Sequence, residues 1–75
     1  MRDLVEYLAK SLVSDPDAVK VEEVDAGRMT VYEVTVAEED VGKIIGRQGK
    51  VIRSIRSVVK AAATRTGTRV DVDVV

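Results

Sequence analysis

The spacing of apolar residues predicts a helix at the start of the chain. In residues 2–13, Leu4, Leu8 and Leu12 recur every four positions, which places them on one stripe of an amphipathic helix. The helix should end shortly before Pro16, because the residue that precedes a proline is pushed out of the helical conformation.

Three later segments alternate apolar and polar residues, as half-buried strands do. The first two, residues 18–24 and 29–36, are separated by a turn sequence in which Gly27 is free to adopt a positive φ angle. They should pair as an antiparallel hairpin. The third, residues 69–74, alternates strictly between valine and a charged residue and is the clearest strand pattern in the chain.

Two helices are expected between the second and the third strand. A short one should open at the acidic residues 38–40, which suit the positive N-terminal end of a helix, and run to about Ile45. A longer one should begin near Lys50 and be capped by Gly67. Its apolar residues fall within about 140° of arc on a helical wheel, which is wide enough to cover a sheet. They are Val51, Ile52, Ile55, Val58, Val59, Ala62 and Ala63.

These elements predict a single domain, residues 1–75, of the α+β class. Their order is helix, strand, strand, helix, helix, strand. The third strand returns through a helical crossover and should therefore lie parallel to the second strand. Each strand has one apolar face, so we expect a two-layer sandwich. Three helices should cover one face of a three-stranded mixed sheet, and the other face should be exposed to water.

The residue types that are absent exclude several classes of function. Without cysteine the chain has no disulfide, thiolate nucleophile or sulfur-ligated metal, and without histidine it lacks the commonest general base and metal ligand. The acidic residues 38–40 already have a structural explanation, so we expect neither an enzyme nor a bound cofactor or metal. No signal peptide and no membrane-spanning run is recognisable, which favours a cytoplasmic protein.

Charge is distributed unevenly along the chain, although the net charge is only −1. Residues 1–40 carry 4 basic and 11 acidic side chains, a balance of −7, whereas residues 41–75 carry 8 basic and 2 acidic ones, a balance of +6. No acidic residue occurs between Val41 and Val70. This basic block favours one positive surface that faces an anionic partner.

The basic block contains a loop that is suited to binding phosphate. Two predicted helices meet across the four residues from Gly46 to Gly49, and the terminal glycines permit a tight turn and a close approach of a ligand. Backbone amides at the start of the second helix point into this loop, where the helix dipole adds partial positive charge. Full positive charges come from Lys43, Arg47 and Lys50.

Two enzymatic motifs with similar glycines do not fit. A P-loop requires GxxxxGK followed by serine or threonine, but Ile44 stands at the first glycine position and Val51 follows the lysine. A dinucleotide fingerprint requires GxGxxG directly after a strand, whereas the segment before Gly46 is expected to be helical. A plain helical corner capped by glycines stays open as a second interpretation of the loop alone.

The longer helix adds a basic edge to the loop. On a helical wheel, Arg53, Arg56 and Lys60 lie within about 60° of each other, at one border of the apolar stripe. An edge of this kind leads away from the loop and offers a track for successive phosphates.

The segment from Val41 to Ile52, VGKIIGRQGKVI, resembles the signature of the KH domain, a module that binds RNA and single-stranded DNA. That signature consists of a short aliphatic-rich helix, a GXXG loop and a second helix. The order of all the elements resembles the type II, or prokaryotic, KH arrangement. In its size the chain is similar to the KhpA family of free-standing bacterial RNA-binding proteins.

The resemblance implies a mechanism and a set of binding residues. In KH domains the GXXG backbone clamps the sugar–phosphate chain of about four nucleotides, and the bases lie in a groove between the two helices and the edge strand. Carried over, the clamp is Gly46, Arg47, Gln48 and Gly49. The phosphate contacts are Lys43, Lys50 and Arg53. The apolar residues that would line either the groove or only the core are Ile44, Ile45 and Ile52.

The resemblance also implies partners. The ligand is expected to be single-stranded RNA or single-stranded DNA, bound with weak sequence preference because this half of the chain has no aromatic residue for base stacking. A role in RNA metabolism, translation or ribosome assembly follows, including that of an RNA chaperone. Proteins of this kind are associated with self-association and with a second, KhpB-like KH protein, so a homodimer or heterodimer is expected.

The main alternative is a protein-interaction module that uses the KH groove or the sheet to bind a partner protein, with the GXXG loop vestigial. An acidic or bulky apolar residue in the loop would favour this alternative. The loop carries Arg47 and Gln48 instead.

Overall fold

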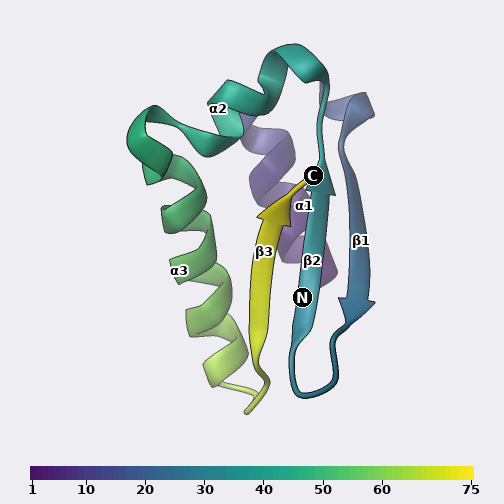
Figure 1. Ribbon diagram of the computed structural model, residues 1–75, viewed down its shortest axis with the longest axis vertical. Coiled ribbons are helices and arrows are strands. Elements are labelled where there is room, and N and C mark those ends of the chain that lie inside the picture. Colours follow the sequence, from purple (N-terminus) through teal and green to yellow (C-terminus); the bar gives the residue numbers. More distant parts are fainter.

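The computed structural model describes residues 1–75 and arranges them in two layers, with the predicted order of elements (Figure 1). The helices are α1 (Arg2–Leu12), α2 (Val41–Ile45) and α3 (Lys50–Thr64). The strands are β1 (Lys20–Asp25), β2 (Thr30–Thr35) and β3 (Val70–Val74). Single 3₁₀ turns, η1 (Pro16–Ala18), η2 (Glu38–Asp40) and η3 (Arg47–Gly49), connect them. The α+β sandwich predicted from the sequence is confirmed.

The three strands form one mixed sheet in the order β1-β2-β3. β1 and β2 are antiparallel and form the predicted hairpin, and β3 lies parallel to β2 as the helical crossover requires. The register aligns Val21 with Val34 and Tyr32 with Val72, so apolar residues share one face of the sheet. In Figure 1, α1 lies behind the sheet and α3 runs beside β3.

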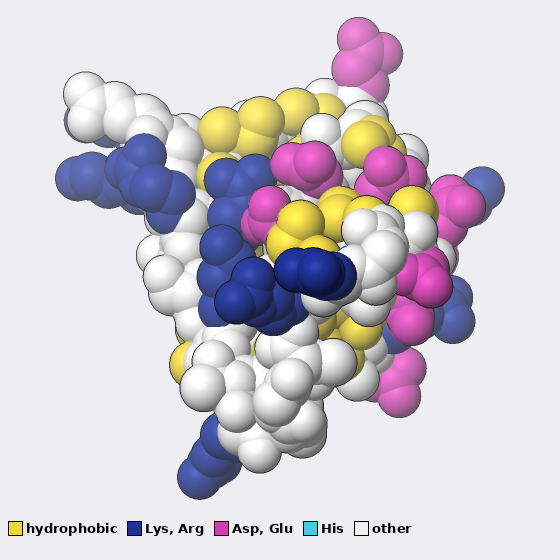
Figure 2. Space-filling model, turned by 60° about the horizontal axis from the view of Figure 1, so that its bottom comes forward, with side chains coloured by type: hydrophobic (Ala, Val, Ile, Leu, Met, Phe, Trp, Pro, Cys, Tyr) yellow, Lys and Arg dark blue, Asp and Glu magenta, His cyan; other side chains and the backbone are white.

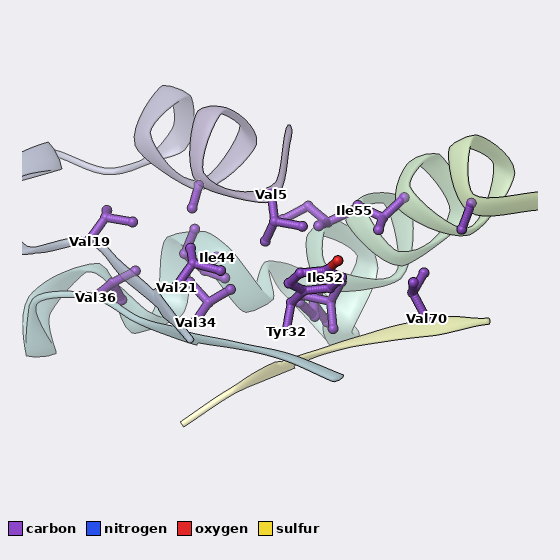
Figure 3. Close-up of a cluster of buried hydrophobic side chains, with 14 residues drawn as sticks. Val5, Val19, Val21, Tyr32, Val34, Val36, Ile44, Ile52, Ile55 and Val70 are labelled. Carbon is purple, nitrogen blue, oxygen red and sulfur yellow. The ribbon is translucent and has the colours of Figure 1, made fainter. Parts of the chain in front are cut away.

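The core lies between the helices and this apolar face of the sheet (Figure 3). It consists of aliphatic side chains, alanine and one tyrosine. Its buried members are Val5, Ala9, Val19, Val21, Tyr32, Val34, Val36, Ile44, Ile52, Ile55, Val59, Ala63, Val70 and Val72. Branched aliphatics fill most of this space, and Tyr32 is its one aromatic residue.

One residue of the predicted apolar stripe on α3 is exposed to solvent. Val58 is 49% exposed, whereas Ile55 and Val59 on either side of it are buried. A stripe about 140° wide is broader than the surface that the sheet and α1 cover. Val58 therefore lies on an open border of α3, which the sequence pattern alone assigned to the interior.

The end of α3 confirms the cap predicted at Gly67. This glycine has a φ angle of 72°, in the left-handed region. Its amide donates to the carbonyl of Thr64 at 3.2 Å, and the amide of Thr68 donates to the carbonyl of Ala63 at 3.1 Å. These two bonds form a Schellman motif, which satisfies the last carbonyls of the helix and turns the chain toward β3.

Asp40 has a structural role that the sequence did not reveal. Its side chain makes no capping bond to α2, although it stands at the N-cap position of that helix. It is fully buried, and its two carboxylate oxygens accept hydrogen bonds from the amides of Ser14, at 3.1 Å, and Asp15, at 3.0 Å. Lys43 lies 3.6 Å from the carboxylate and donates to the Ser14 hydroxyl. Asp40 thus ties the start of α2 to the segment that follows α1.

The surroundings of Asp40 favour its ionised form. Burial alone opposes ionisation, but the two backbone amides and the Lys43 ammonium more than offset it and lower the pKa of Asp40 below its ordinary value. A carboxylate with a lowered pKa in the folded state stabilises the fold at every pH above its unfolded value, near pH 4. This contribution is lost as the pH falls through the folded value.

Replacement of Asp40 by asparagine should therefore lower the stability of the fold and make that stability less dependent on pH in the acidic range. An asparagine side chain has only one oxygen to accept from the two backbone donors, so at pH 7 we expect the Tm of Asp40→Asn to fall by about 5 °C or more. Between pH 5 and 2 (about the range over which such a carboxylate titrates) the Tm should fall less steeply than in the unmodified protein. Thermal melts followed by circular dichroism measure both effects. The exposed neighbour provides a matched control, and Glu39→Gln with the same profile as Asp40→Asn would contradict the assignment.

Candidate nucleic-acid interface

The loop between α2 and α3 has the geometry that its glycines predicted. Gly46 ends α2 with φ 75° and ψ 173°, and Gly49 precedes α3 with φ 74° and ψ 17°. Between them, Gln48 also has a positive φ, 57°, which is uncommon outside glycine. Three residues with positive φ within four positions reverse the chain over a single 3₁₀ turn.

Gly46 is required by sterics as well as by its backbone angles. A Cβ atom at this position would lie 2.9 Å from the backbone nitrogen of Val51 and 2.8 Å from its Cβ. The angles themselves fall in a region that is essentially restricted to glycine. At Gly49 the nearest atom to a Cβ would be Nη1 of Arg53, at 3.4 Å, so the constraint there is the positive φ alone. Gly46 therefore sets how closely the loop packs against the first turn of α3.

The start of α3 combines a helix terminus with nearby positive charge. Its N-cap is Gly49, and no side chain caps the helix. The first amides of a helix have no partner within the helix, and the helix dipole places partial positive charge beside them. This fifteen-residue helix also begins beside two exposed cations, Arg47 and Lys50, so full and partial positive charges lie close together here.

The four cations near the loop are not equally free. The side chains of Arg47 and Lys50 take part in no ion pair of the chain. Arg53 is exposed, but its Nη1 donates to the carbonyl of Gln48 at 2.9 Å and so fastens the loop to α3. Lys43 is held by Asp40 and by the Ser14 hydroxyl, although half of its side chain stays exposed.

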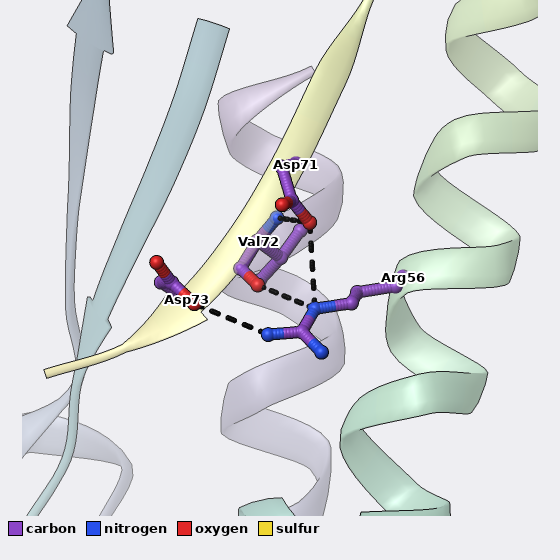
Figure 4. A network of polar contacts seen from close by, with 4 residues as sticks. All are labelled: Arg56, Asp71, Val72 and Asp73. Atoms are coloured by element: carbon purple, nitrogen blue, oxygen red, sulfur yellow. Dashed lines mark hydrogen bonds and ion pairs between the residues drawn. The ribbon is translucent and has the colours of Figure 1, made fainter.

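Arg56 does not belong to the free basic edge that the helical wheel predicted. Its guanidinium reaches across to β3, as Figure 4 shows, and its Nε donates to the carbonyl of Val72 at 2.8 Å. Nε also lies 3.4 Å from Asp71, and Nη2 lies 3.1 Å from Asp73. A wheel places Arg56 correctly on α3 but carries no information about the acidic residues that β3 brings beside it. Arg56 therefore fastens α3 to the sheet.

The three isoleucines of the motif occupy two different environments. Ile44 and Ile52 are 1% and 7% exposed and belong to the core. Ile45 is 38% exposed, on the other side of α2. Ile44 and Ile52 thus anchor the two helices that flank the loop in the core. Ile45 is the one of the three isoleucines that presents a large apolar surface to solvent.

The surface is divided by charge, as the sequence predicted. In Figure 2 lysine and arginine side chains gather on the left and centre of the molecule, and acidic side chains gather mainly on the right. On this view, side chains of opposite charge are thus concentrated in different regions, with a few acidic ones among the basic ones.

A second feature of the surface is an apolar groove between α1 and α3. It has a volume of about 320 Å³. Its lining residues are Leu8, Leu12, Lys50, Val51, Ser54, Ile55 and Val58. Leu12 and Val58 are 40% and 49% exposed in it. Because this groove is open to solvent between the two helices, no other side chain covers Val58.

Two other kinds of feature are missing from the chain. No group of three or more acidic, histidine or cysteine residues is arranged to hold a metal ion. No helix is both long and apolar enough to cross a membrane.

The steric role of Gly46 predicts a large difference between two adjacent loop substitutions. Gly46→Asp should cost about 2–4 kcal/mol of unfolding free energy, because it combines forbidden backbone angles with overlap against Val51. Arg47→Asp introduces the same side chain at an exposed position and should change stability by less than about 0.5 kcal/mol. Urea unfolding of both variants measures the difference. Equal losses would show that the loop does not have this geometry.

Two solved structures share the fold of this chain. Era of Aquifex aeolicus bound to GDP and aluminium fluoride matches with a TM-score of 0.68 and 21% identity. Era in complex with MgGDPNP and nucleotides 1506–1542 of 16S ribosomal RNA matches with a TM-score of 0.69 and 21% identity. Each match covers 97% of this chain but 28% of the Era chain, so this protein corresponds to about a quarter of Era. At this identity the likeness concerns the fold.

Relatives of similar length identify the family. The RNA-binding protein KhpA of Clostridium acetobutylicum is 47% identical over 75 residues, with full coverage of both chains. The RNA-binding protein KhpA of Caldanaerobacter subterraneus subsp. tengcongensis is 45% identical, also with full coverage. Residues 2–74 match the family described as KhpA/KhpB, KH domain. The chain therefore belongs to the KhpA/KhpB family of KH domains.

Proposed function

We propose that this protein binds single-stranded RNA by clamping its sugar–phosphate backbone at the loop Gly46–Gly49, without catalysing a reaction. The observation that carries the proposal is the uncapped N-terminus of α3, which opens at this loop beside the unpaired cations Arg47 and Lys50. The names of the relatives, RNA-binding protein KhpA, support RNA as the ligand. A clamp of this kind spans about four nucleotides.

The residues of the site divide the work of binding. The partial positive charge at the start of α3 attracts a phosphate, and Arg47 and Lys50 neutralise the adjacent phosphates of the strand. Arg53 holds the Gln48 carbonyl and in this way keeps the loop in its binding shape while it adds positive charge. Lys43 is paired with Asp40, which neutralises part of its charge, so Lys43 is a weaker phosphate contact. Ile45 offers apolar surface to a base, whereas Ile44 and Ile52 act from the core.

The same arrangement predicts weak sequence preference. The only aromatic residues are Tyr7 and Tyr32, which lie in α1 and β2, so no ring stacks on a base at the loop. Phosphate contacts carry no sequence information by themselves. Single-stranded DNA should therefore bind as well. A non-specific binder of this kind suits a cytoplasmic role in RNA metabolism, translation or ribosome assembly.

A second function, association with another KH protein, is favoured by the apolar groove between α1 and α3. Leu12 and Val58 expose large apolar surfaces there, and the only charged residue in its lining is Lys50. A second copy that presents the same groove would cover these surfaces around a two-fold axis. Two linked loops would then hold one RNA strand more tightly than a single loop. A KhpB-like KH protein would serve the same purpose as a heterodimer.

The clamp is tested by placing two negative charges in the loop. The double variant Arg47→Asp, Gln48→Asp should stay folded, because both side chains are exposed and aspartate tolerates the positive φ of position 48. Its affinity for a short single-stranded RNA should fall by at least about tenfold, since carboxylates now occupy the phosphate site. In the unmodified protein, neutralising about two phosphates gives a slope of log K against log salt of roughly −1.5. Fluorescence anisotropy measures both.

A matched control separates the clamp from the groove. Val58→Glu places a charge in the apolar groove and leaves the loop untouched. It should abolish self-association in sedimentation experiments and leave the affinity for a short oligonucleotide unchanged, because an oligonucleotide that spans one domain gains nothing from avidity. A folded loop double variant that binds RNA as tightly as the unmodified protein would remove the clamp from this account.

A further inference from the structure

A second group of cations, here called the far-end cluster, lies at the end of α3 that is remote from the loop Gly46–Gly49. Its members are Arg28, Lys60, Arg65 and Arg69. They come from the turn between β1 and β2, from α3 and from its connection to β3. All four are exposed, and none takes part in an ion pair of the chain. These segments meet at the bottom of Figure 1, and basic side chains gather at the centre of Figure 2, where the bottom comes forward.

Contacts within the fold hold the segments of the far-end cluster side by side. The amide of Thr30 donates to the carbonyl of Arg69 at 2.9 Å, so the hairpin that carries Arg28 lies beside the start of β3. Lys60 and Arg69 line one hollow, with a volume of about 270 Å³, to which Met29 of the hairpin also contributes. An anion that enters this hollow therefore meets two unpaired cations from different segments.

The fold accounts for only part of the far-end cluster. Cations near the C-terminal end of a helix interact favourably with its dipole, which explains Arg65 and, less strongly, Lys60. Arg28 and Arg69 lie outside the helix. Asp25, at the end of β1, accepts a hydrogen bond from the amide of Gly27 at 3.0 Å and pairs with none of the four. Like charges held together without a partner repel one another, so this surface favours an anionic ligand.

We propose that the far-end cluster is a second phosphate-binding site, which holds the sugar–phosphate backbone of the RNA strand after the strand has left the clamp. This inference rests on the clamp proposed above. Arg53 and Lys60 are seven residues apart and so share one side of α3, which leads from the loop to the cluster. The fifteen residues of α3 span about 22 Å, which at about 3.4 Å per phosphate of a stacked strand corresponds to roughly six nucleotides.

The middle of this path carries no free charge. Arg56 stands between Arg53 and Lys60, but its guanidinium is paired with Asp71 and Asp73 of β3 (Figure 4). Free positive charge is therefore concentrated at the two ends of α3. A strand that is held at one end reaches the other at a high effective concentration, so the second contact adds affinity without reading sequence.

RNA that is long enough to reach both sites should bind more tightly than a tetramer, which the clamp alone accommodates. The double variant Lys60→Gln, Arg69→Gln removes two exposed charges and should leave the Tm and the affinity for a tetramer unchanged. Its affinity for a single-stranded dodecamer should fall by about fivefold or more. The slope of log K against log salt for the dodecamer should change from roughly −3, for about four phosphates, to roughly −1.5, for about two. Fluorescence anisotropy measures both quantities.

Two controls separate the far-end cluster from other causes of the same loss. Lys20→Glu lowers the net charge by the same amount at an exposed position of β1 and should leave the affinity for the dodecamer unchanged. In the Val58→Glu background, where self-association is expected to be abolished, the loss caused by Lys60→Gln, Arg69→Gln should persist. A loss that vanishes in this background would assign the gain to a second protomer and overturn the inference.

The two oligonucleotides distinguish failure of this inference from failure of the clamp. If the folded double variant binds the dodecamer as tightly as the unmodified protein does, with the same salt slope, the far-end cluster does not contact RNA and the inference is wrong. If the unmodified protein shows no salt-dependent binding to the tetramer, the proposed clamp fails instead.

Discussion

The contact between Gly46 and the first turn of α3 is the constraint on which the rest of the site depends. Because Val51 leaves no room for a side chain at this point, the chain can reverse within four residues only through a glycine with a positive φ. The reversal leaves the amides at the start of α3 without a capping side chain. The amides of Gly49 and Lys50 donate to the carbonyls of Gly46 and Arg47 within the loop itself. The helix dipole adds partial positive charge at this point.

The fold also determines which charges are available at the surface. Asp40 and Arg56 are both committed to structural contacts, the first between α2 and the segment that follows α1 and the second between α3 and β3. Together they fix the two helices that flank the loop against the remainder of the domain. The cations that remain unpaired at the loop, Arg47 and Lys50, are those closest to the helix terminus. A rigid pair of helices and a small number of free charges at their junction suit a site that binds phosphate without reading sequence.

The sequence predicted the layers and the loop because both depend on local patterns. Alternation of apolar and polar residues in the strands, and four-residue spacing in the helices, assign residues to the core face. The glycines at positions 46, 49 and 67 indicate where the backbone takes a positive φ. The pattern could not predict the role of Asp40, whose partners Ser14 and Asp15 lie 26 and 25 residues away in the chain. It also misassigned Val58, since the width of the covered face depends on how α1 packs.

The central claim is that RNA binds at the junction of α2 and α3, and a nuclear magnetic resonance titration tests it most directly. A ¹⁵N-labelled sample is titrated with a single-stranded RNA hexamer while the backbone amide signals are followed. We expect the largest shifts from Gly42 to Val51, with little change in β1 and in the groove residues Leu8 and Leu12. Shifts concentrated in that groove or on the open face of the sheet, with the loop amides unchanged, would contradict the account.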